Sequence, residues 1–302
     1  MPVWCSGPDD ERALGHPERA RSSAEGRERS EQGGVVSEAA LLQVAVAGVG
    51  VLGPGLTGWP QSATVLRTPS DWSAATTVVP PPNRLPSTER RRAGIGVKAA
   101  IVVADEACAM AGVAIDGMAT VFTSASGDPE TCHAMCEALA KPERLVSPTR
   151  FTNSVHNAPA GYWHIAAQSR SASTSLAAYD ASLCAGLLEA ATQCCASSAA
   201  VLLVACDIPY PEPLHALRPL SDVFACALLL VPAGGTGWPL TLTLGPQGEA
   251  THCASAALDA LRRSIPTARV LPLLEALACD EPRTLRLDGA GLDLALQVAA
   301  RR

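Results

Sequence analysis

The chain has 302 residues, of which 48% are hydrophobic, and its formal net charge is −6. This length and apolar content suffice for one large hydrophobic core or two smaller ones. Lys and Arg are not gathered into a basic face, which argues against nucleic acid or an anionic membrane as partner and favours small molecules or proteins. The longest apolar run, 223–231, falls short of the roughly 18–20 residues that span a bilayer, so we expect no membrane span.

The 11 cysteines lack the spacing of a disulfide framework, and the first residues, MPVWCSGPDDER, lack the basic and apolar regions of a secretory leader. We therefore expect a cytoplasmic protein with mostly free, buried thiols. Residues 1–38 are rich in Arg, Glu, Ser and Gly and carry almost no branched apolar residues. Such a segment cannot bury enough surface to order itself, which predicts a disordered tail.

From residue 39 onward, apolar strands alternate with alanine-rich helices. Strands are predicted at 41–53, 118–128, 173–179, 200–207, 222–232 and 238–245, with short strands at 285–287 and 292–298. Helices are predicted at 96–112, 129–140, from 161 onward, 181–195 and 251–265, and Pro-rich connections run over 67–92 and 208–219. The alternation of the two element types predicts an α/β layered sheet.

The glycines of VAVAGVGVLG, at positions 48, 50 and 53, have the G-x-G-x-x-G spacing directly after a strand. This spacing is typical of a dinucleotide-binding turn, in which the pyrophosphate meets a helix N-terminus. Prolines and further glycines follow at once over 54–60, so we expect no helix to begin there, and no acidic residue ends a second strand about 20 residues on. The pattern is therefore interpreted as a glycine-rich turn, and no cofactor is expected.

Three potential metal ligands, Cys132, His133 and Cys136, fall within one predicted helical turn. A zinc site usually needs four ligands in two close pairs, and no second pair appears. We expect no metal and interpret these cysteines as core or half-buried residues. The adjacent Cys194 and Cys195 are interpreted as packing residues, because neighbouring cysteines are too strained for an ordinary disulfide.

The segment SVHNAPAGYWHIA holds the densest polar and aromatic cluster, with His156, Tyr162, Trp163 and His164. A histidine could act there as a general base near neutral pH. The helical periodicity from Gly161 onward equally favours packing in a core or an interface. Both interpretations stay open at this point.

The stretch STSLAAYDASLCAGLLEA, residues 173–190, predicts a strand that turns abruptly into a helix, with Asp180 at the turn. A cysteine at such a corner would be activated for thioester chemistry by the helix dipole and by nearby amide donors. A carboxylate is a poor nucleophile toward thioesters. Because Asp is among the preferred N-cap residues, we predict that Asp180 caps the helix.

In this order, the motifs resemble those of the β-ketoacyl synthases of the thiolase-like fold, over about residues 43–245. The resemblance rests on VAVAGVGVLGPGL, VFTSASGD, SPTRFTNSVHNAPAGY, the corner, VLLVACD and FACALLLVP. Residues that match the family pattern are Asn157, Ala160, Gly161, Arg170, Ser173 and Ser175. The resemblance implies a thiolase-like layered α/β/α fold with a mixed, mainly five-stranded sheet. It implies one half of the usual two-half fold, with 39–245 as the N-terminal half and 246–302 as a short remainder of the same domain.

Two departures from the family concern catalysis. The family's nucleophilic Cys position falls on Asp180, and the nearest thiol, Cys184, lies one helical turn further on. The family also has two histidines in its C-terminal half, whereas this chain has only His252 after His215, in a sequence that matches neither motif. The alternative is an active acyltransferase or condensing enzyme that uses Cys184, with His156 or His164 as base.

A ketoacyl-synthase-like chain without the catalytic residues resembles a chain length factor, the partner of a catalytic synthase in type II fatty-acid-like and polyketide biosynthesis. The phrases NSVHNAPAGYW, TSLAAYDASLCAGLLEA and LP…ERRR are similar to the subfamily of bacterial aryl polyene pigment clusters. The resemblance implies a heterodimer with the synthase, an acyl carrier protein as further partner, and a chain that is inactive alone. Strand 173–179 would pair across the dimer axis. The acyl-pocket and interface candidates are Asn157, Gly161, Tyr162, Trp163 and Phe224.

Overall fold

The computed structural model describes residues 41–302 except 246–247, 290 and 292. The predicted tail, 1–38, lies outside the described residues. Residues Ala39–Arg302 form one compact unit. Among the described residues, no helix is long and apolar enough to cross a membrane.

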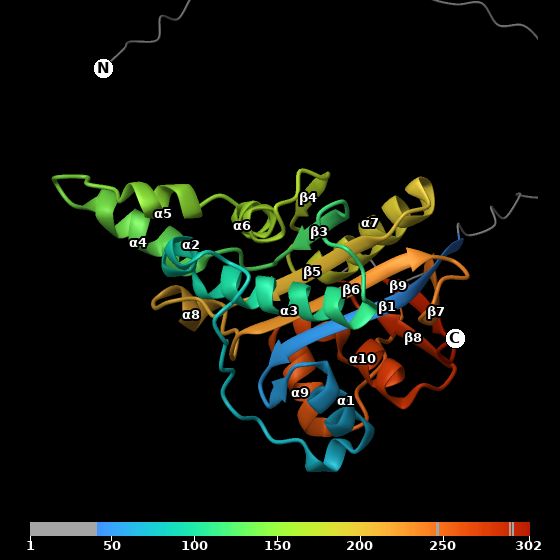
Figure 1. The fold of residues 1–302 in the computed structure, drawn as a ribbon. Coiled ribbons are helices and arrows are strands. Elements are labelled where there is room, and N and C mark those ends of the chain that lie inside the picture. The colour runs from blue at the N-terminus through green and yellow to red at the C-terminus, as the bar shows by residue number, and fades with distance from the viewer. Residues whose placement is uncertain (1–40, 246–247, 290, 292) are drawn as a thin grey trace, which may run out of the picture. The chain divides into compact units, whose positions relative to one another are not determined.

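The centre of the unit is one mixed sheet of nine strands in the order β4-β3-β5-β6-β1-β7-β9-β8, with β2 beside β1 (Figure 1). The strands are β1 (Leu41–Gly53), β2 (Leu56–Thr57), β3 (Ala119–Thr123), β4 (Ser173–Leu176), β5 (Val201–Asp207), β6 (Phe224–Pro232), β7 (Trp238–Leu244), β8 (Arg283–Leu287) and β9 (Leu294–Val298). Strand β3 is parallel to β4 and β5, and the other neighbours are antiparallel. Strand β4 therefore lies at one edge of the sheet.

Helices cover both faces of the sheet, which confirms the predicted α/β/α layering (Figure 1). They are α1 (Trp59–Arg67), α2 (Ser87–Arg92), α3 (Ile95–Ala111), α4 (Pro129–Ala140), α5 (Pro148–Asn153), α6 (Ala158–Ala167), α7 (Ser182–Ser197), α8 (Leu214–Leu217), α9 (Ala256–Ser264) and α10 (Leu271–Cys279). Helices α3 and α6 pack in the core of one face. Helices α1, α7, α9 and α10 pack in the core of the other face.

The sheet is wider than the mainly five-stranded sheet that was predicted. Strands β4, β3, β5, β6 and β1 form the five-stranded part, and β7, β9 and β8 continue it beyond β1. The extension is possible because β1 is 13 residues long. Its first half, Leu41–Val46, pairs with β7, while Val44–Leu52 pairs with β6 on the opposite side. The C-terminal segment thus completes the same sheet.

A helix does begin after the glycine-rich turn, contrary to our expectation. Helix α1 starts at Trp59 with Pro60 in its first turn. A proline is tolerated there, because the first amides of a helix have no intrahelical acceptor. The Glu106 carboxylate of α3 accepts hydrogen bonds from the backbone amides of Trp59 and Val51. An internal carboxylate thus occupies the helix N-terminus where a dinucleotide phosphate would have to bind. Burial raises the pKa of Glu106, although these two amide bonds act against the rise.

Gly48 and Gly50 of this pattern serve close packing between β1 and α3. A Cβ atom at Gly50 would lie 2.0 Å from the Val103 carbonyl oxygen, and one at Gly48 would lie 2.0 Å from that of Ala107. Both contacts are with helix backbone, which cannot rotate away. Both residues lie inside strand β1 and pair with β6, so the interpretation of these two positions as a glycine-rich turn is wrong. The glycines are needed instead for the close approach of the strand to the helix.

We predict that Gly50→Ala lowers the free energy of unfolding by about 3 kcal/mol, because the methyl group forces α3 away from β1. The matched control is Gly117→Ala, since a Cβ at Gly117 meets nothing within 4 Å. The control is expected to change stability by less than about 0.5 kcal/mol. Urea denaturation of both variants measures the difference. Equal stabilities would contradict this account of the glycine.

The cysteines follow the predictions only in part. Six of the ten that the structure describes are buried, as expected. Cys132 and Cys136 are exposed, so their interpretation as core or half-buried residues is wrong. The reason is that α4 buries only Pro129 of its own residues. Cys194 is buried and packs as predicted, whereas Cys195 is exposed. Within the described part of the chain, no group of three or more His, Cys, Asp and Glu residues could hold a metal ion.

Candidate functional site

The corner between β4 and α7 is a tight, closed turn. Strand β4 ends at Leu176 and α7 begins at Ser182, so the turn is longer than predicted. The Ser182 hydroxyl accepts a hydrogen bond from the Ala178 amide (3.0 Å) and donates one to the Tyr179 carbonyl (2.6 Å). Tyr179 has a left-handed backbone with φ 52°. The Ser182 side chain thus fixes the conformation of the turn.

Asp180 does not cap α7, so this prediction is wrong. The N-cap residue is Ala181, and no side chain caps the helix. The Asp180 carboxylate instead accepts hydrogen bonds from two guanidinium groups, one on each oxygen. Arg218 Nη2 lies 2.7 Å from Oδ1, and Arg269 Nη2 lies 3.1 Å from Oδ2. Charge-assisted bonds of this kind are stronger than a bond to a neutral amide. This explains why the carboxylate binds the two arginines and does not cap the backbone amides of α7.

Both arginines come from segments far along the chain. Arg218 follows α8, and Arg269 lies in the 3-10 turn Thr267–Val270 that precedes α10. Their side chains are only 18% and 14% exposed. Arg269 also donates to the Asp180 carbonyl (3.2 Å) and lies near the Asp288 carboxylate (3.6 Å). Neither arginine is among the site residues that the sequence predicts. A signal was available for Arg269, since a single cation within PTARVLPLLEALA indicates a buried, paired group.

A second carboxylate, Asp207, is fully buried and holds the loops around this corner in place. Asp207 ends β5, and one of its oxygens accepts from the amides of Ala125 (2.7 Å) and Ser126 (2.9 Å), in the loop after β3. The other oxygen accepts from the amide (2.9 Å) and the hydroxyl (2.7 Å) of Thr267. Thr267 begins the 3-10 turn that carries Arg269. Asp207 therefore helps to set the position of one of the two arginines at Asp180.

Cys184 lies inside the core and not at the surface of the corner. It is buried in α7, and its sulfur faces the Leu287 carbonyl oxygen at 3.9 Å. Burial raises the pKa of this thiol to about 12, with the nearby Arg269 charge acting against the rise. The nucleophilic form of cysteine is the thiolate, which is scarce at neutral pH when the pKa is this high. The geometry therefore argues against Cys184 as a nucleophile.

We predict that Cys184 in the folded protein reacts with iodoacetamide roughly 100-fold more slowly than the exposed Cys136, because it is a buried thiol. Peptide mass spectrometry over a time course measures both rates in one sample. The same experiment in urea is the control, since unfolding should make the two rates similar. Fast alkylation of Cys184 in the folded chain would contradict its assigned burial.

The contacts that the structure describes for His252, His164 and His156 do not include Asp180. His252 Nδ1 lies 3.1 Å from Asp259 and its Nε2 lies 3.3 Å from Glu249, and these carboxylates raise its pKa. His164 is carried by α6.

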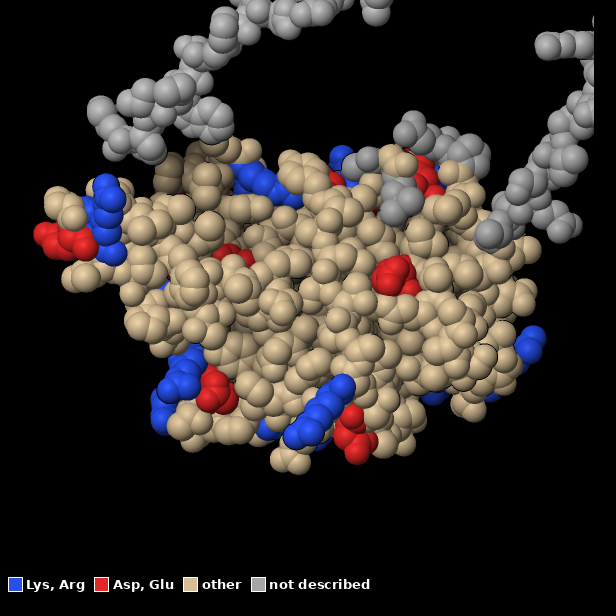
Figure 2. All heavy atoms as spheres, turned by 90° about the horizontal axis from the view of Figure 1, so that it is seen from above, with Lys and Arg blue, Asp and Glu red and all other residues tan. Residues whose placement is uncertain are grey.

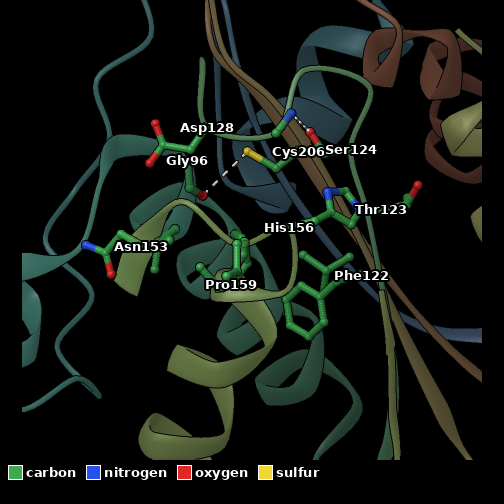
Figure 3. A pocket seen from close by; sticks show the side chains of 15 residues that line it. Gly96, Phe122, Thr123, Ser124, Asp128, Asn153, His156, Pro159 and Cys206 are labelled. Atoms are coloured by element: carbon green, nitrogen blue, oxygen red, sulfur yellow. Dashed lines mark hydrogen bonds between the residues drawn. The ribbon is translucent and has the colours of Figure 1, made fainter. Parts of the chain in front are cut away.

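His156 lines a pocket between α3, the ends of β3 and β5, and the connection from α5 to α6 (Figure 3). The pocket is lined by Gly96, Val97, Ala100, Phe122, Thr123, Ser124, Gly127, Asp128, Asn153, Val155, His156, Ala158, Pro159, Val204 and Cys206.

The five acyl-pocket and interface candidates are not brought together. Asn157 and Gly161 are exposed at the start of α6. Tyr162 and Trp163 are buried in the core that α6 shares with α3, and the Tyr162 hydroxyl donates to Asn153 (3.0 Å). Phe224 is buried in the core of the opposite face. None of the five lines the pocket that contains His156.

A family model described as the N-terminal domain of β-ketoacyl synthases matches residues 59–284. The chain therefore belongs to the family of β-ketoacyl synthase N-terminal domains, which confirms the resemblance. It matches no curated protein.

Solved structures of ketosynthases share the fold. A complex of the ketosynthase ApeO with its chain length factor ApeC, from Xenorhabdus doucetiae, matches with a TM-score of 0.65 and 22% identity, covering 85% of this chain and 99% of that chain. A β-ketoacyl synthase from Burkholderia phymatum STM815 gives a TM-score of 0.63 and 14% identity, covering 86% and 100%. The ishigamide ketosynthase/chain length factor gives 0.62 and 14%, covering 86% and 99%. At these identities the likeness concerns the fold.

Proposed function

We propose that this chain is a chain length factor, a non-catalytic partner of a catalytic ketoacyl synthase in type II fatty-acid-like or polyketide biosynthesis of the aryl polyene type. The observation that carries the proposal is the position of Asp180 and its contacts with two arginines. It stands where the family resemblance puts the nucleophilic cysteine, and each of its carboxylate oxygens accepts a hydrogen bond from an arginine. Chain length factors in complex with ketosynthases are among the solved structures with this fold.

The chemistry of the corner supports the absence of acyl transfer on this chain. A carboxylate held by two guanidinium groups has its lone pairs engaged, and it is a weak nucleophile toward a thioester even when free. The nearest thiol, Cys184, is buried and its pKa is raised to about 12. Acyl transfer and condensation would therefore take place on the cysteine of a partner synthase. An acyl carrier protein would deliver the substrates, and the assembly would work in the cytoplasm without a cofactor.

The five acyl-pocket and interface candidates have two proposed roles, which depend on whether the residue is exposed or buried. Asn157 and Gly161 are exposed at the start of α6, so they are proposed as contacts at the interface with the synthase. Tyr162, Trp163 and Phe224 are buried. We propose that these three act through packing, because their bulk determines where α6 and β6 lie beside the growing acyl chain.

The test is co-expression with a cysteine-bearing ketoacyl synthase encoded in the same gene neighbourhood. We expect the two chains to co-purify as a heterodimer. After incubation with acyl carrier protein thioesters, peptide mass spectrometry should find the acyl group on the synthase and none on this chain. An acyl adduct on a Cys184 peptide of the isolated chain would overturn the proposal and support the active acyltransferase instead.

A further inference from the structure

Helix α4 presents two thiols to solvent on one face. Cys132 and Cys136 are both exposed. Their spacing of four residues places them one above the other on the helix surface, with Cβ atoms about 5–6 Å apart. The Cys132 thiol forms a side-chain hydrogen bond with the Cys136 thiol. The two sulfur atoms therefore face each other across one helical turn.

This pair has no role in packing. Helix α4 buries only Pro129 of its own residues, whereas six of the ten described cysteines are buried. A free cysteine usually behaves as a small core residue, so a facing pair at the surface needs another explanation. In the part of the chain that the structure describes, one further cysteine is exposed. This is Cys195 on α7, whose other two cysteines are buried, and it provides a single-thiol comparison.

The spacing of the pair disfavours a disulfide and suits a bridge through one atom. A disulfide needs Cβ atoms about 3.5–4.5 Å apart, so closing one here would distort the helix. An ion between the two sulfurs lengthens the bridge. With two metal–sulfur bonds of about 2.3 Å, the sulfurs can lie up to roughly 4.6 Å apart. Both thiolates can therefore bind the same ion while α4 keeps its shape.

The neighbouring polar side chains indicate the kind of ion. The Asp128 carboxylate caps α4 through the amide (3.0 Å) and the hydroxyl (2.9 Å) of Thr131. His133 Nε2 lies 3.5 Å from the Glu137 carboxylate, one turn along the helix. Since no group of three or more His, Cys, Asp and Glu residues among the described ones could hold a metal ion, the pair has to bind with two ligands. Two soft sulfur ligands do not suffice for zinc, which needs four, and they favour the soft ion Cu(I).

The charge of the surrounding surface agrees with a soft ion. In the view from above, α4 and α5 lie at the left as in Figure 1, and the surface shows few charged side chains (Figure 2). Hard cations such as Mg²⁺ and Ca²⁺ need several oxygen ligands, chiefly carboxylates. The two thiols, and not a patch of surface charge, therefore determine which ion this face binds.

We propose that Cys132 and Cys136 form a site for one Cu(I) ion, which is bound by the two thiolates. On binding, each thiol releases its proton to solvent and forms one copper–sulfur bond, and no electron is transferred. The site differs from the zinc site that the sequence argues against, because it needs two ligands instead of four. The ion links two successive turns of α4, a helix that its Asp128 cap stabilises and that buries little surface. This inference is independent of the proposed function.

The first test is an anaerobic titration of the purified chain with Cu(I) against a chromophoric Cu(I) chelator. We expect one tightly bound Cu(I) per chain that both single variants of the pair lose. Cys132→Ser and Cys136→Ser should each raise the Kd by about tenfold or more, because the second thiolate binds intramolecularly only when both are present. Cys195→Ser removes one exposed thiol elsewhere and should leave the Kd within about twofold of the unaltered chain. A Cys132→Ser variant that binds as tightly as the unaltered chain overturns the proposal.

A spacing variant keeps the number of thiols and changes only their geometry. The double variant Cys136→Ser, Ala134→Cys places the second thiol two residues from Cys132, where the two side chains do not face each other. It should bind Cu(I) as weakly as Cys136→Ser does. Tight binding by the spacing variant would show that any two thiols on α4 suffice, which contradicts the assigned site.

A second probe measures the facing pair without a variant. Phenylarsine oxide reacts with two neighbouring thiols, forming two arsenic–sulfur bonds and releasing one water, with no change of oxidation state. It should protect both Cys132 and Cys136 from iodoacetamide in the folded chain and leave Cys195 reactive, as peptide mass spectrometry of one sample measures. Absence of protection would contradict the facing arrangement. Protection without tight Cu(I) binding would confirm the pair and overturn Cu(I) as its ligand.

Discussion

Asp180→Asn is expected to lower the free energy of unfolding by about 2–4 kcal/mol, because removal of one partner of a shielded ion pair leaves the other charges uncompensated. Two arginines depend on this carboxylate, at 2.7 and 3.1 Å, and both are mostly shielded from water. The asparagine retains the shape of the side chain and removes only its charge. The measurement is urea denaturation at pH 7.

The matched control for this variant is Asp105→Asn. Asp105 pairs with Arg84 at the surface, where both side chains are more than a third exposed. An exposed pair of this kind is worth roughly 0–1 kcal/mol, so the control should lose little stability. If the two variants lose the same free energy, the double arginine contact of Asp180 has no special structural role.

Asp180→Cys is expected to create a reactive thiol, with a pKa below about 7.5, because a thiolate would replace the carboxylate between two guanidinium groups and near the N-terminus of α7. We expect its alkylation by iodoacetamide to exceed that of Cys184 in the same sample by roughly 100-fold or more. The rate of alkylation as a function of pH gives the pKa directly. Asp180→Ser, which lacks the thiol, is the control for modification at other cysteines.

The same variant should not become a synthase. The resemblance implies that the family's two catalytic histidines have no counterpart in this chain. In addition, Arg218, which follows α8, and Arg269 of the 3-10 turn lie beside residue 180. An acyl group transferred to the new cysteine would therefore remain there without condensation. Formation of a condensation product by the isolated variant would overturn the proposal that this chain is a non-catalytic partner.

Periodicity and local signals were sufficient for most of the elements that place the site. The prediction of a helix over 129–140 agrees with α4 at both ends, since Pro129 in the first turn and the Asp128 cap are local signals. The strand predicted at 200–207 is β5, Val201–Asp207, because a continuous apolar run of this length indicates a buried strand. Helix α1 was not predicted, because its first turn lies in a segment rich in glycine and proline, which usually indicates a loop. The proline of the helix, Pro60, is in the first turn, where a helix tolerates it.

The sequence by itself determined the family, the layered fold and the acid at the corner, because these depend on residue type and on order along the chain. Only the tertiary structure decided what the acid does. The partners of Asp180 are 38 and 89 residues away, so no local pattern could predict that two arginines would turn its carboxylate away from the helix end. In the same way, the reactivity of Cys184 depends on whether its thiol is buried. The thiol becomes buried only when α7 packs against the completed sheet.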